Sequence, residues 1–532
     1  MAFDGSAFDL RAEVAYTSGV DVGAALRTLI ETRLPRDPIT REPNGFILFK
    51  PGVYSVGASG TVEVPRGVTL WFLPGALLIP VRPVGREGDP GLHLRGGLRA
   101  PLLTVFGTPA VTRAVGLTGL VERVGWVAVN SDSVPDLWAH WWGAGDTALA
   151  TSAQRSPTHA EPLDWQGRVD TDALQAVLDC ASRRRSLSPE GAPPRVKARG
   201  LHYIVETLHL GSPRAPVGGS EGLVVDAETV TGATFIGRPG LGVDPLLRVR
   251  DVGELRLVGL SLVEGDRGLR SEPSRLIEVA SSSATPSGVT LLEACSFTAQ
   301  WSTMALVRSE GAFKGEGSVV FDRCVWSPAA GGETTEGLRV AEESRGVTVR
   351  RSRFEGTVTS MIALQRGALV VDACRIVARP YGPLNFWRDP GRGVAILIDM
   401  KDPAPVGLTV SATTSRCMQL LRDNWNQYPG ATKRARVLLK GVIHAHPLDA
   451  DAAIPGILAE VGYAVMLRCT LDEPLRVVGC RFGERPGARD AQVALGGLAP
   501  EIEDYGTWSI ASEPFVPLDG VAATVRRMGP VG

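Results

Sequence analysis

Val319-Val-Phe-Asp-Arg-Cys-Val-Trp326 is the clearest copy of a short pattern that recurs through the C-terminal half of the chain. In each copy apolar residues alternate with other residues, two turn-like residues follow, and a small residue then precedes another apolar one. Further copies begin at Leu255, Val289, Val347, Leu369, Leu408, Val437 and Leu475. Because the alternation has a period of two, the pattern predicts short strands with one buried face.

The spacing of the copies predicts how these strands are connected. The small residue of each copy falls at Leu260, Cys295, Cys324, Ser352, Cys374, Thr413, Val442 and Cys480, which gives steps of 22–39 residues. Such steps suit coils of three short strands with variable loops, and they are too irregular for helical repeats. Second apolar strands precede most copies, as in Leu276–Val279, Met304–Val307 and Val394–Ile398. We therefore predict an all-β fold, a right-handed single-stranded parallel β-helix, or solenoid, with short capping helices.

In such a coil equivalent side chains stack in ladders about 4.8 Å apart. Cys295, Cys324, Cys374 and Cys480 share one repeat position, which predicts an inward ladder of small apolar side chains. A metal site or a reactive thiol is the alternative reading of these cysteines. On the same reasoning we expect Leu291, Phe321 and Val349 to lie inside.

The charged residues of the repeat have a structural interpretation too. Asp322 and Asp372 share a position with Arg350 between them, which favours a surface salt-bridge ladder over catalysis. We expect Glu278 and Arg339 to face outward in the same way.

Composition limits the classes of function. The 532 residues are 44% hydrophobic and 21% charged, as in a globular protein. A net charge of −1 offers no basic field, so we expect no nucleic-acid partner. Seven cysteines without a CxxC pair indicate neither a disulfide framework nor a zinc site, and we expect no metal and no cofactor.

The N-terminal residues show no secretory signal, and the apolar stretches are only as long as strands. We therefore expect synthesis in the cytoplasm without a signal peptide and no membrane insertion. The final location is then cytoplasmic, or extracellular as part of a particle.

The N-terminal half has a different organisation. A helical stretch covers Val22 to Arg33 and the strand Phe46–Phe49 follows it, while a second helix is expected to start with Asp170 or Thr171 as its N-cap. We divide the chain into an entry module (1–130), a Trp-rich junction with a capping helix (131–200), the β-helix (201–485) and a C-terminal cap or tail (486–532).

Several of these segments resemble a known family. Pro51-Gly-Val-Tyr54, Gly67-Val-Thr-Leu70 and the helix segment Asp170–Gln175 are similar to elements of the pectate-lyase-like superfamily. The stretch Trp138-Ala-His-Trp-Trp-Gly-Ala-Gly-Asp146 resembles the entry module of phage-tailspike-like bacterial β-helix proteins. The resemblance implies the β-helix and a helix that caps its first coil. It does not imply an activity, because the superfamily contains lyases, hydrolases, epimerases and inactive scaffolds.

Residues that could carry chemistry are few. The catalytic motifs of polygalacturonases and pectate lyases are absent, and no two Asp residues are adjacent. His444 and His446 would share one strand face, but no third metal ligand is near them in the sequence. Trp138, Trp141 and Trp142 are expected to pack at the junction, with sugar stacking as the alternative.

Two loops, Tyr381–Pro390 and Arg422–Pro429, combine the residue types that bind sugars. Trp387 and Trp425 would offer stacking faces, and Asp389 and Asp423 would be the general acid and base of an enzyme. Hydrogen bonds to sugar would come from Asn385, Arg388, Asn424 and Tyr428, and Tyr381 is a further candidate sugar-binding residue. The alternative is that these aromatic residues pack under their own loops or against a partner subunit.

Two classes of function stay open. We expect a non-catalytic or weakly catalytic scaffold, a component of a larger phage-derived or surface assembly that binds polysaccharide. Its partners would be polysaccharide, further copies of itself or other assembly subunits. The alternative is a tailspike-like polysaccharide hydrolase or lyase, so the sequence leaves open whether the chain is an enzyme.

Overall fold

The structure is a computed structural model, and it divides the chain into two compact units that are considered separately. Unit 1 comprises Met1–Leu241 with Val252–Leu260, and unit 2 comprises Gly242–Asp251 with Ser261–Gly532. The residues that the structure describes are 7–86, 88–148, 162–183, 195–211, 223–227, 232–237, 244–250, 252, 254–265, 275–282, 289–299, 303–310, 318–328, 334–341, 346–379, 393–400, 406–423, 434–445, 463–483, 492–496, 500–509, 514–518 and 523–528.

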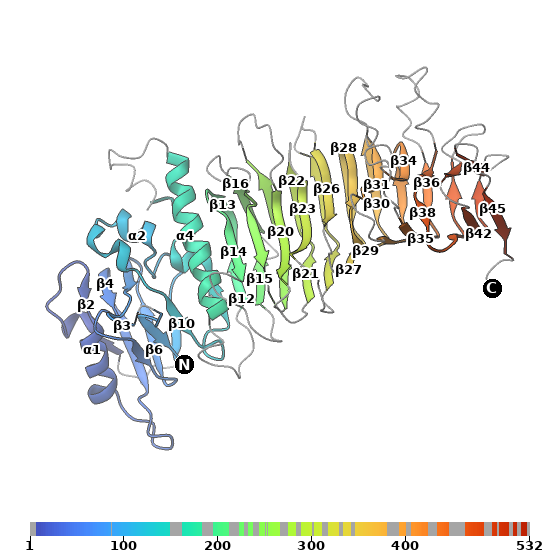
Figure 1. Ribbon diagram of the computed structural model, residues 1–532. Coiled ribbons are helices and arrows are strands. Elements are labelled where there is room, and N and C mark those ends of the chain that lie inside the picture. The colour runs from blue at the N-terminus through green and yellow to red at the C-terminus, as the bar shows by residue number, and fades with distance from the viewer. Residues whose placement is uncertain are drawn as a thin grey trace. The chain divides into compact units, whose positions relative to one another are not determined.

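Unit 1 begins with short strands that pair in parallel and form three small sheets, β1-β3-β6-β9, β2-β4-β7 and β5-β8-β10 (Figure 1). The chain visits the three sheets in turn, which is the path of a coil. The strands are β1 (Ala7–Asp9), β2 (Val20–Asp21), β3 (Gly45–Phe49), β4 (Gly52–Val56), β5 (Val62–Val64), β6 (Val68–Phe72), β7 (Ala76–Pro80), β8 (Leu92–Leu94), β9 (Gly97–Arg99) and β10 (Val127–Val129). The entry module is therefore itself a short three-sheet coil.

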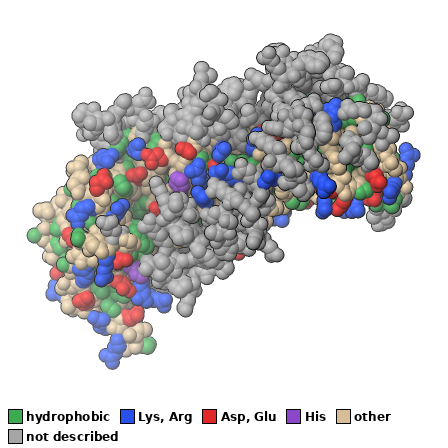
Figure 2. Space-filling view, in the orientation of Figure 1, with side chains coloured by type: hydrophobic (Ala, Val, Ile, Leu, Met, Phe, Trp, Pro, Cys, Tyr) green, Lys and Arg blue, Asp and Glu red, His purple; other side chains and the backbone are tan. Residues whose placement is uncertain are grey.

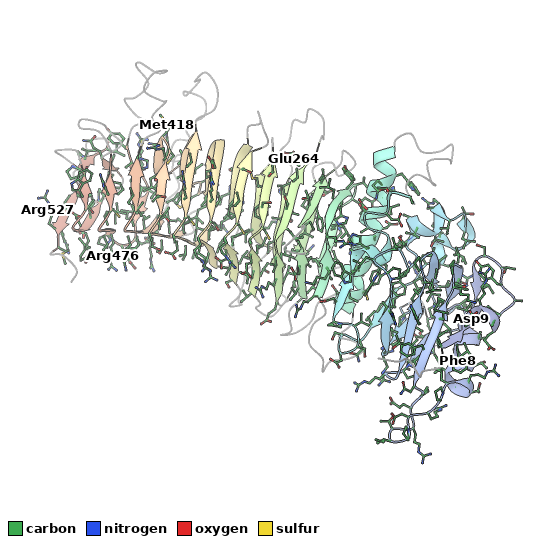
Figure 3. All side chains as sticks on the ribbon, turned by 180° about the vertical axis from the view of Figure 1, so that it is seen from behind. Phe8, Asp9, Glu264, Met418, Arg476 and Arg527 are labelled. Atoms are coloured by element: carbon green, nitrogen blue, oxygen red, sulfur yellow. The ribbon has the colours of Figure 1, made fainter. Side chains whose placement is uncertain are left out.

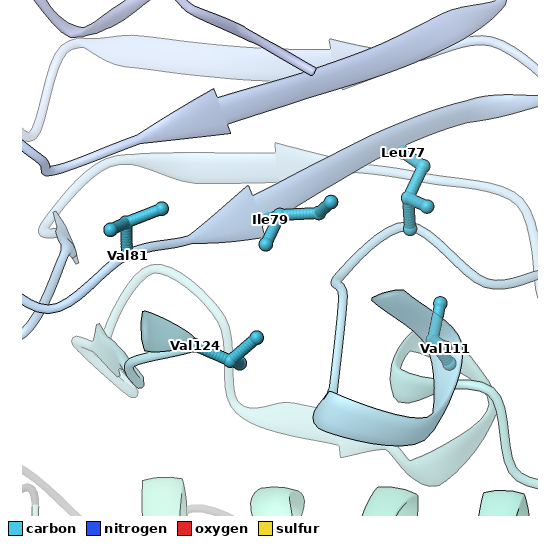
Figure 4. Packing of buried hydrophobic residues seen from close by; sticks show 5 residues of the cluster. All are labelled: Leu77, Ile79, Val81, Val111 and Val124. Carbon is cyan, nitrogen blue, oxygen red and sulfur yellow. The ribbon is translucent and has the colours of Figure 1, made fainter. Parts of the chain in front are cut away.

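Helices accompany these strands. The predicted stretch Val22 to Arg33 forms α1 (Gly23–Thr28) and the π-helical turn η2 (Leu29–Arg33). The other helical segments before the junction are η1 (Leu10–Ala12), α2 (Pro109–Ala114) and η3 (Thr118–Arg123). Leu77, Ile79 and Val81 pack with Val111 of α2 and with Val124, so this side of the coil has an apolar core of its own (Figure 4).

The junction contains β11 (Asp136–Trp138), η4 (Ala139–Trp142) and the long helix α4 (Pro162–Arg183). Trp141 and Trp142 are buried, and the Trp142 ring lies 5.0 Å from that of Phe106, which confirms that these two residues pack at the junction. The expected N-cap is wrong, because α4 begins at Pro162 and Asp170 lies in its interior. The coil of unit 1 then resumes with β12 (Arg195–Ala198), β13 (Gly200–Ile204), β14 (Leu208–Gly211), β15 (Leu223–Ala227), β16 (Ala233–Gly237) and β18 (Leu255–Val258).

Unit 2 is a parallel β-helix, and each coil places one strand on each of three faces. Parallel pairing continues beyond residue 485, from β39 to β42 and β45. Face 1 contains β21 (Val289–Glu293), β24 (Ser318–Asp322), β27 (Gly346–Arg350), β29 (Gly367–Asp372), β32 (Val406–Ser411), β35 (Arg434–Lys440), β39 (Leu475–Val478), β42 (Glu501–Tyr505) and β45 (Thr524–Arg527), and β38 (Thr470–Leu471) also pairs with β35.

The strand β28 (Arg353–Leu364) runs through both other faces, because its first half pairs with β30 and its second half with β31. Face 2 contains β19 (Leu260–Glu264), β22 (Ser296–Ala299), β25 (Val325–Pro328), β30 (Arg375–Arg379), β33 (Thr414–Arg416), β36 (Ile443–Ala445), β40 (Arg481–Phe482) and β43 (Trp508–Ser509). Face 3 contains β17 (Leu247–Arg250), β20 (Arg275–Ser282), β23 (Thr303–Glu310), β26 (Thr334–Ala341), β31 (Val394–Ile398), β34 (Gln419–Asp423), β37 (Val465–Leu467), β41 (Val493–Leu495) and β44 (Phe515–Pro517).

The small residue of each repeat points inward at the corner between faces 1 and 2. All eight of these residues are buried, and the cysteines among them are not paired in disulfides, which confirms the predicted ladder. The residue before each one has positive φ, between 45° and 67°, and it is Gly259, Ala294, Arg323, Arg351, Ala373, Ala412, Gly441 or Gly479. A residue with a left-handed backbone conformation therefore turns the chain at each of these corners.

Inside face 2, side chains stack from coil to coil as predicted. The Trp326 ring lies 5.1 Å from that of Phe297 and 4.1 Å from that of Phe354, in stacked geometry. The ladder becomes polar further along, where the Ser415 Oγ lies 3.0 Å from His444 Nδ1, and it becomes aromatic again at Phe482.

One expected core residue is wrong by a single position. Leu292 pairs with Phe321 and is fully buried, while Leu291 pairs with Val320 and is half-buried. The turn at Ala294 follows Glu293 directly, so Leu292 is the residue that falls three before the small position, as Phe321 and Val349 do. Side chains alternate about the strands, and Arg476 of face 1 points away from the coil interior (Figure 3).

Among the described residues no helix is both long and apolar enough to cross a membrane.

Candidate functional site

Helix α4 docks on the coil that follows it in unit 1 through polar side chains. Asp170 accepts hydrogen bonds from the backbone N–H groups of Gly145 (2.7 Å) and Tyr203 (2.8 Å). Thr171 accepts one from Val205 N–H, and the Gln175 amide both accepts from and donates to the backbone of His209. These side chains satisfy backbone groups of β13, β14 and the turn between them, which would otherwise be buried without partners.

Close approach of α4 requires one small residue. A Cβ atom at Gly167 would lie 2.4 Å from the Val205 side chain, so only glycine lets the helix contact the coil here. Behind this contact, burial raises the pKa of Asp170 to about 6 and lowers that of His202 to about 4. Both shifts disfavour the charged form, because the two groups lie in a water-poor junction.

Beside α4, unit 1 is hollowed into a cleft of about 610 Å³. One wall is a single face of the helix, because Asp172, Gln175, Ala176 and Asp179 follow one another at i, i+3, i+4 and i+7. The opposite walls come from the entry module and from the turn after β13, and they include Arg82, Thr108, Trp126, Glu206 and Thr207. A cavity of this volume is in the range of small-ligand sites.

The chemistry of the cleft is polar with one aromatic plane. Burial raises the pKa of Asp172, although its Oδ2 accepts a hydrogen bond from Ala110 N–H (2.9 Å). Glu206 pairs with Arg168 at 2.7 Å. The half-exposed Trp126 indole is oriented by its Nε1–H, which donates to Gly88 O (3.2 Å). Carboxylates, hydroxyl groups and an indole are among the groups that recognise polyhydroxylated ligands.

The residues predicted from the two loops fall almost entirely outside the described residues. Those seven sugar-binding candidates and Asp389 lie there, and their proposed roles stay predictions. The seven are Tyr381, Asn385, Trp387, Arg388, Asn424, Trp425 and Tyr428. Asp423 is described; it ends β34, is buried, and its Oδ2 accepts hydrogen bonds from Arg468 N–H (2.8 Å) and Cys469 N–H (2.6 Å).

Other carboxylates of unit 2 lie in ion pairs. Asp322 pairs with Arg350 (3.2 Å) and Arg351 as predicted, but it is buried and not on the surface. Asp372 has no ion-pair partner among the described residues and accepts a hydrogen bond from Ser411 Oγ (2.5 Å), so the predicted ladder does not extend to it. Burial alone would raise the pKa of Asp322, but these guanidinium groups hold it below its usual range. Charged side chains of both signs are interspersed over the visible described surface (Figure 2).

Glu278 differs from its expected setting. It faces outward beside Arg248 in the register, yet it is fully buried, between Arg275 (2.9 Å) and Arg308 (2.6 Å). Burial alone would raise the pKa of Glu278, but the arginines, Arg308 first, hold it below its usual value. The alternation of residue types in a sequence indicates on which side of a strand a side chain lies. It cannot show that long neighbouring side chains cover a charged group.

The cysteines of unit 2 and its one described histidine, His444, lie in its interior. Burial raises the pKa of both Cys374 and Cys480 to about 11, so their thiols are protonated at neutral pH. His444 is buried against Ser415, and His446 lies outside the described residues. In the described part of the chain no three His, Cys, Asp or Glu side chains come together as a metal site would require.

Sequence reasoning missed the cleft. Its helical wall was detectable in principle, because Asp172, Gln175 and Asp179 share one face of a predicted helix. Nothing in the sequence marked Trp126 and Glu206 as site residues, since their place in the same cleft as that helix face depends on how the helix docks. Comparison of the chain with family models, with curated proteins and with solved structures finds no match.

Proposed function

We propose that this protein is a non-catalytic β-helix scaffold, a component of a larger assembly, that binds polysaccharide in the cleft beside α4. The observation that carries the proposal is the cleft itself, which is lined both by the Trp126 indole and by the polar side chains of one face of α4. An indole supplies an apolar plane for a sugar ring, and carboxylates and hydroxyl groups form hydrogen bonds with sugar hydroxyl groups.

The scaffold part of the proposal is supported by the partners of the buried carboxylates in unit 2. The buried acids Glu278 and Asp322 are held by arginines, and Asp423 is held by backbone N–H groups. Each of these carboxylates thus has partners within the chain and stiffens contacts between coils. Long ladders of paired strands, with each coil braced by the next, suit a rigid spacer.

The alternative is a polysaccharide hydrolase that uses the same cleft. It is favoured by the presence of Asp172, Asp179 and Glu206 in one cleft and by the direction in which burial shifts the pKa of Asp172, upward as in a general acid. Glu206 or Asp179 would then act as the base.

Glycan-array binding by the full chain, followed by titration of the best oligosaccharide, tests the proposal. We expect Trp126→Ala to weaken binding at least about tenfold, equivalent to about 1.4 kcal/mol. Trp71→Ala is the matched control, because Trp71 is also half-exposed in unit 1, lies beneath the Arg99 guanidinium and is outside the cleft. Equal loss in both variants, or binding to no glycan, would contradict the proposal.

Product analysis separates the scaffold from the enzyme. If the cleft is a hydrolase site, the wild type cleaves the bound glycan and Asp172→Asn abolishes cleavage while binding persists. If the chain is a scaffold, neither protein releases product.

A further inference from the structure

The outer side of face 2 carries a row of exposed side chains in strict register. Strand pairing stacks Arg353, Arg375, Thr414, Ile443, Arg481 and Trp508 one above another through β28, β30, β33, β36, β40 and β43. All six are exposed, with 48% of Ile443 and 47% of Trp508 accessible. Five strand spacings make this Arg353–Trp508 row about 24 Å long.

The row combines positive charge with large apolar side chains. It contains three arginines, two large apolar residues and no acid. Arg353 pairs with Glu355, but Arg375 has no ion-pair partner among the described residues. The Arg481 guanidinium lies 4.7 Å from the centre of the Trp508 ring, so these two side chains form one flat platform.

The surface beside the row is formed by small corner residues. The corner residues that precede the last five positions of the row are Ala373, Ala412, Gly441, Gly479 and Gly506, all exposed and without long side chains. Earlier corners carry Arg323 and Arg351 instead. Long side chains at the later corners therefore do not block the approach of a partner to Arg375, Ile443 and Trp508.

We infer that the Arg353–Trp508 row is a docking surface for a protein partner that presents an acidic and apolar surface. The inference rests on the scaffold proposal and names the kind of partner that the assembly would supply. Exposed Trp and Arg side chains with aliphatic neighbours are the residue types enriched at the centres of protein interfaces. A standard interface buries about 800 Å² per partner, a patch about 28 Å across, which is close to the length of the row.

A second copy of the same row does not fit. Two rows aligned in opposite directions would place Arg375 against Arg481, and rows aligned in the same direction would place every arginine against its equal. Like charges in contact oppose such pairing. Charge complementarity therefore selects a surface that carries Asp and Glu around apolar residues.

The test uses the full chain and a defined probe, a random copolymer of glutamate and tyrosine, with polylysine and polygalacturonate as comparison polymers. We expect the copolymer to bind, polylysine not to bind, and Arg375→Glu with Arg481→Glu to weaken copolymer binding at least tenfold. The matched control is Arg436→Glu with Arg476→Glu, which makes the same charge change at exposed positions of face 1. The control should change binding less than twofold.

Trp508→Ala adds a variant without a charge change and should weaken binding by about threefold or more. Unchanged unfolding midpoints show that the variants are folded. Equal weakening by the control pair, or absence of copolymer binding, overturns the inference. Row-dependent binding of polygalacturonate in preference to the copolymer also overturns it, because the row would then be a glycan surface. Binding of glycan that depends on Trp126 alone leaves the proposed function standing while the inference fails.

Discussion

At the corners of the solenoid, replacing alanine by glycine should stabilise the protein, whereas glycine usually destabilises a regular strand. Ala373 has a φ of 50° and is exposed, and its N–H donates to Ser411 O of the next coil (3.0 Å). An L-residue in this left-handed region is strained, because its Cβ approaches the following carbonyl oxygen. Ala373→Gly removes that strain and leaves the hydrogen bond intact.

The expected gain follows from two opposing terms. Left-handed backbone costs a residue with a Cβ about 1–2 kcal/mol. Glycine also lowers the free energy of unfolding by about 0.4–1 kcal/mol, because it increases the conformational entropy of the unfolded chain. Ala373→Gly should therefore stabilise the protein by about 0.5–1 kcal/mol, and the distant Ala294→Gly should add a similar amount.

The same coil offers a control. Ala368 is exposed within β29, so Ala368→Gly should destabilise by about 0.5–1 kcal/mol, as glycine does in a regular strand. In the opposite direction, Gly479→Ala should cost about 0.5–1 kcal/mol by strain alone, because its Cβ would meet nothing within 4 Å.

Urea unfolding followed by circular dichroism measures these changes, provided that the slope of the transition is the same in every variant. Destabilisation by Ala373→Gly of the size seen for Ala368→Gly would refute the reasoning, because the corner would then not be left-handed.

Further predictions concern the core, the junction and the thiols. Leu292→Ala should cost about 2–5 kcal/mol in unfolding free energy, while the half-buried Leu291→Ala should cost clearly less; the reverse order in urea unfolding would return the register to the one first expected. His202 has its pKa lowered from 6.5 to about 4, so the unfolded chain binds more protons and the contribution of His202 to stability is lost as pH falls from about 6.5 to 4. His202→Phe lacks this loss, so the stability difference between variant and wild type should change by about 3 kcal/mol between pH 6.5 and 4. Asp170, whose raised pKa acts in the opposite direction, is present in both proteins and cancels in the difference, and a difference independent of pH would contradict this. Native protein should resist thiol reagents at Cys324, Cys374 and Cys480 until it unfolds, which mass spectrometry of labelled peptides can check.

The fold was predictable because a solenoid repeats its local pattern. Cys324 and Cys374 marked the same inward position in two coils, and the strands around them alternate without interruption. The register slipped by one at Leu291, because the extra apolar residue of Val289-Thr-Leu-Leu-Glu293 allows two alignments. Only the corner turn at Ala294 selects between them.

Tertiary docking explains what could not be predicted. Asp170 looked like an N-cap because an Asp-Thr pair before an apolar helix is a strong capping signal, yet its carboxylate binds the edge of a coil that comes later in the chain. The cleft is lined by both Trp126 and helix α4, segments about fifty residues apart in the chain. No local pattern encodes such a meeting.

The polar interval inside face 2 has a mechanical consequence. Ser415 and His444 interrupt a column that is aromatic at Phe297, Trp326 and Phe354 and again at Phe482. Since each coil is held only by its neighbours, cohesion along the column is set locally, and dispersion between stacked rings gives way here to polar contacts of His444 with Ser415 and Cys417. We expect a force pulling along the axis to part the column at this seam, leaving an apolar block on either side.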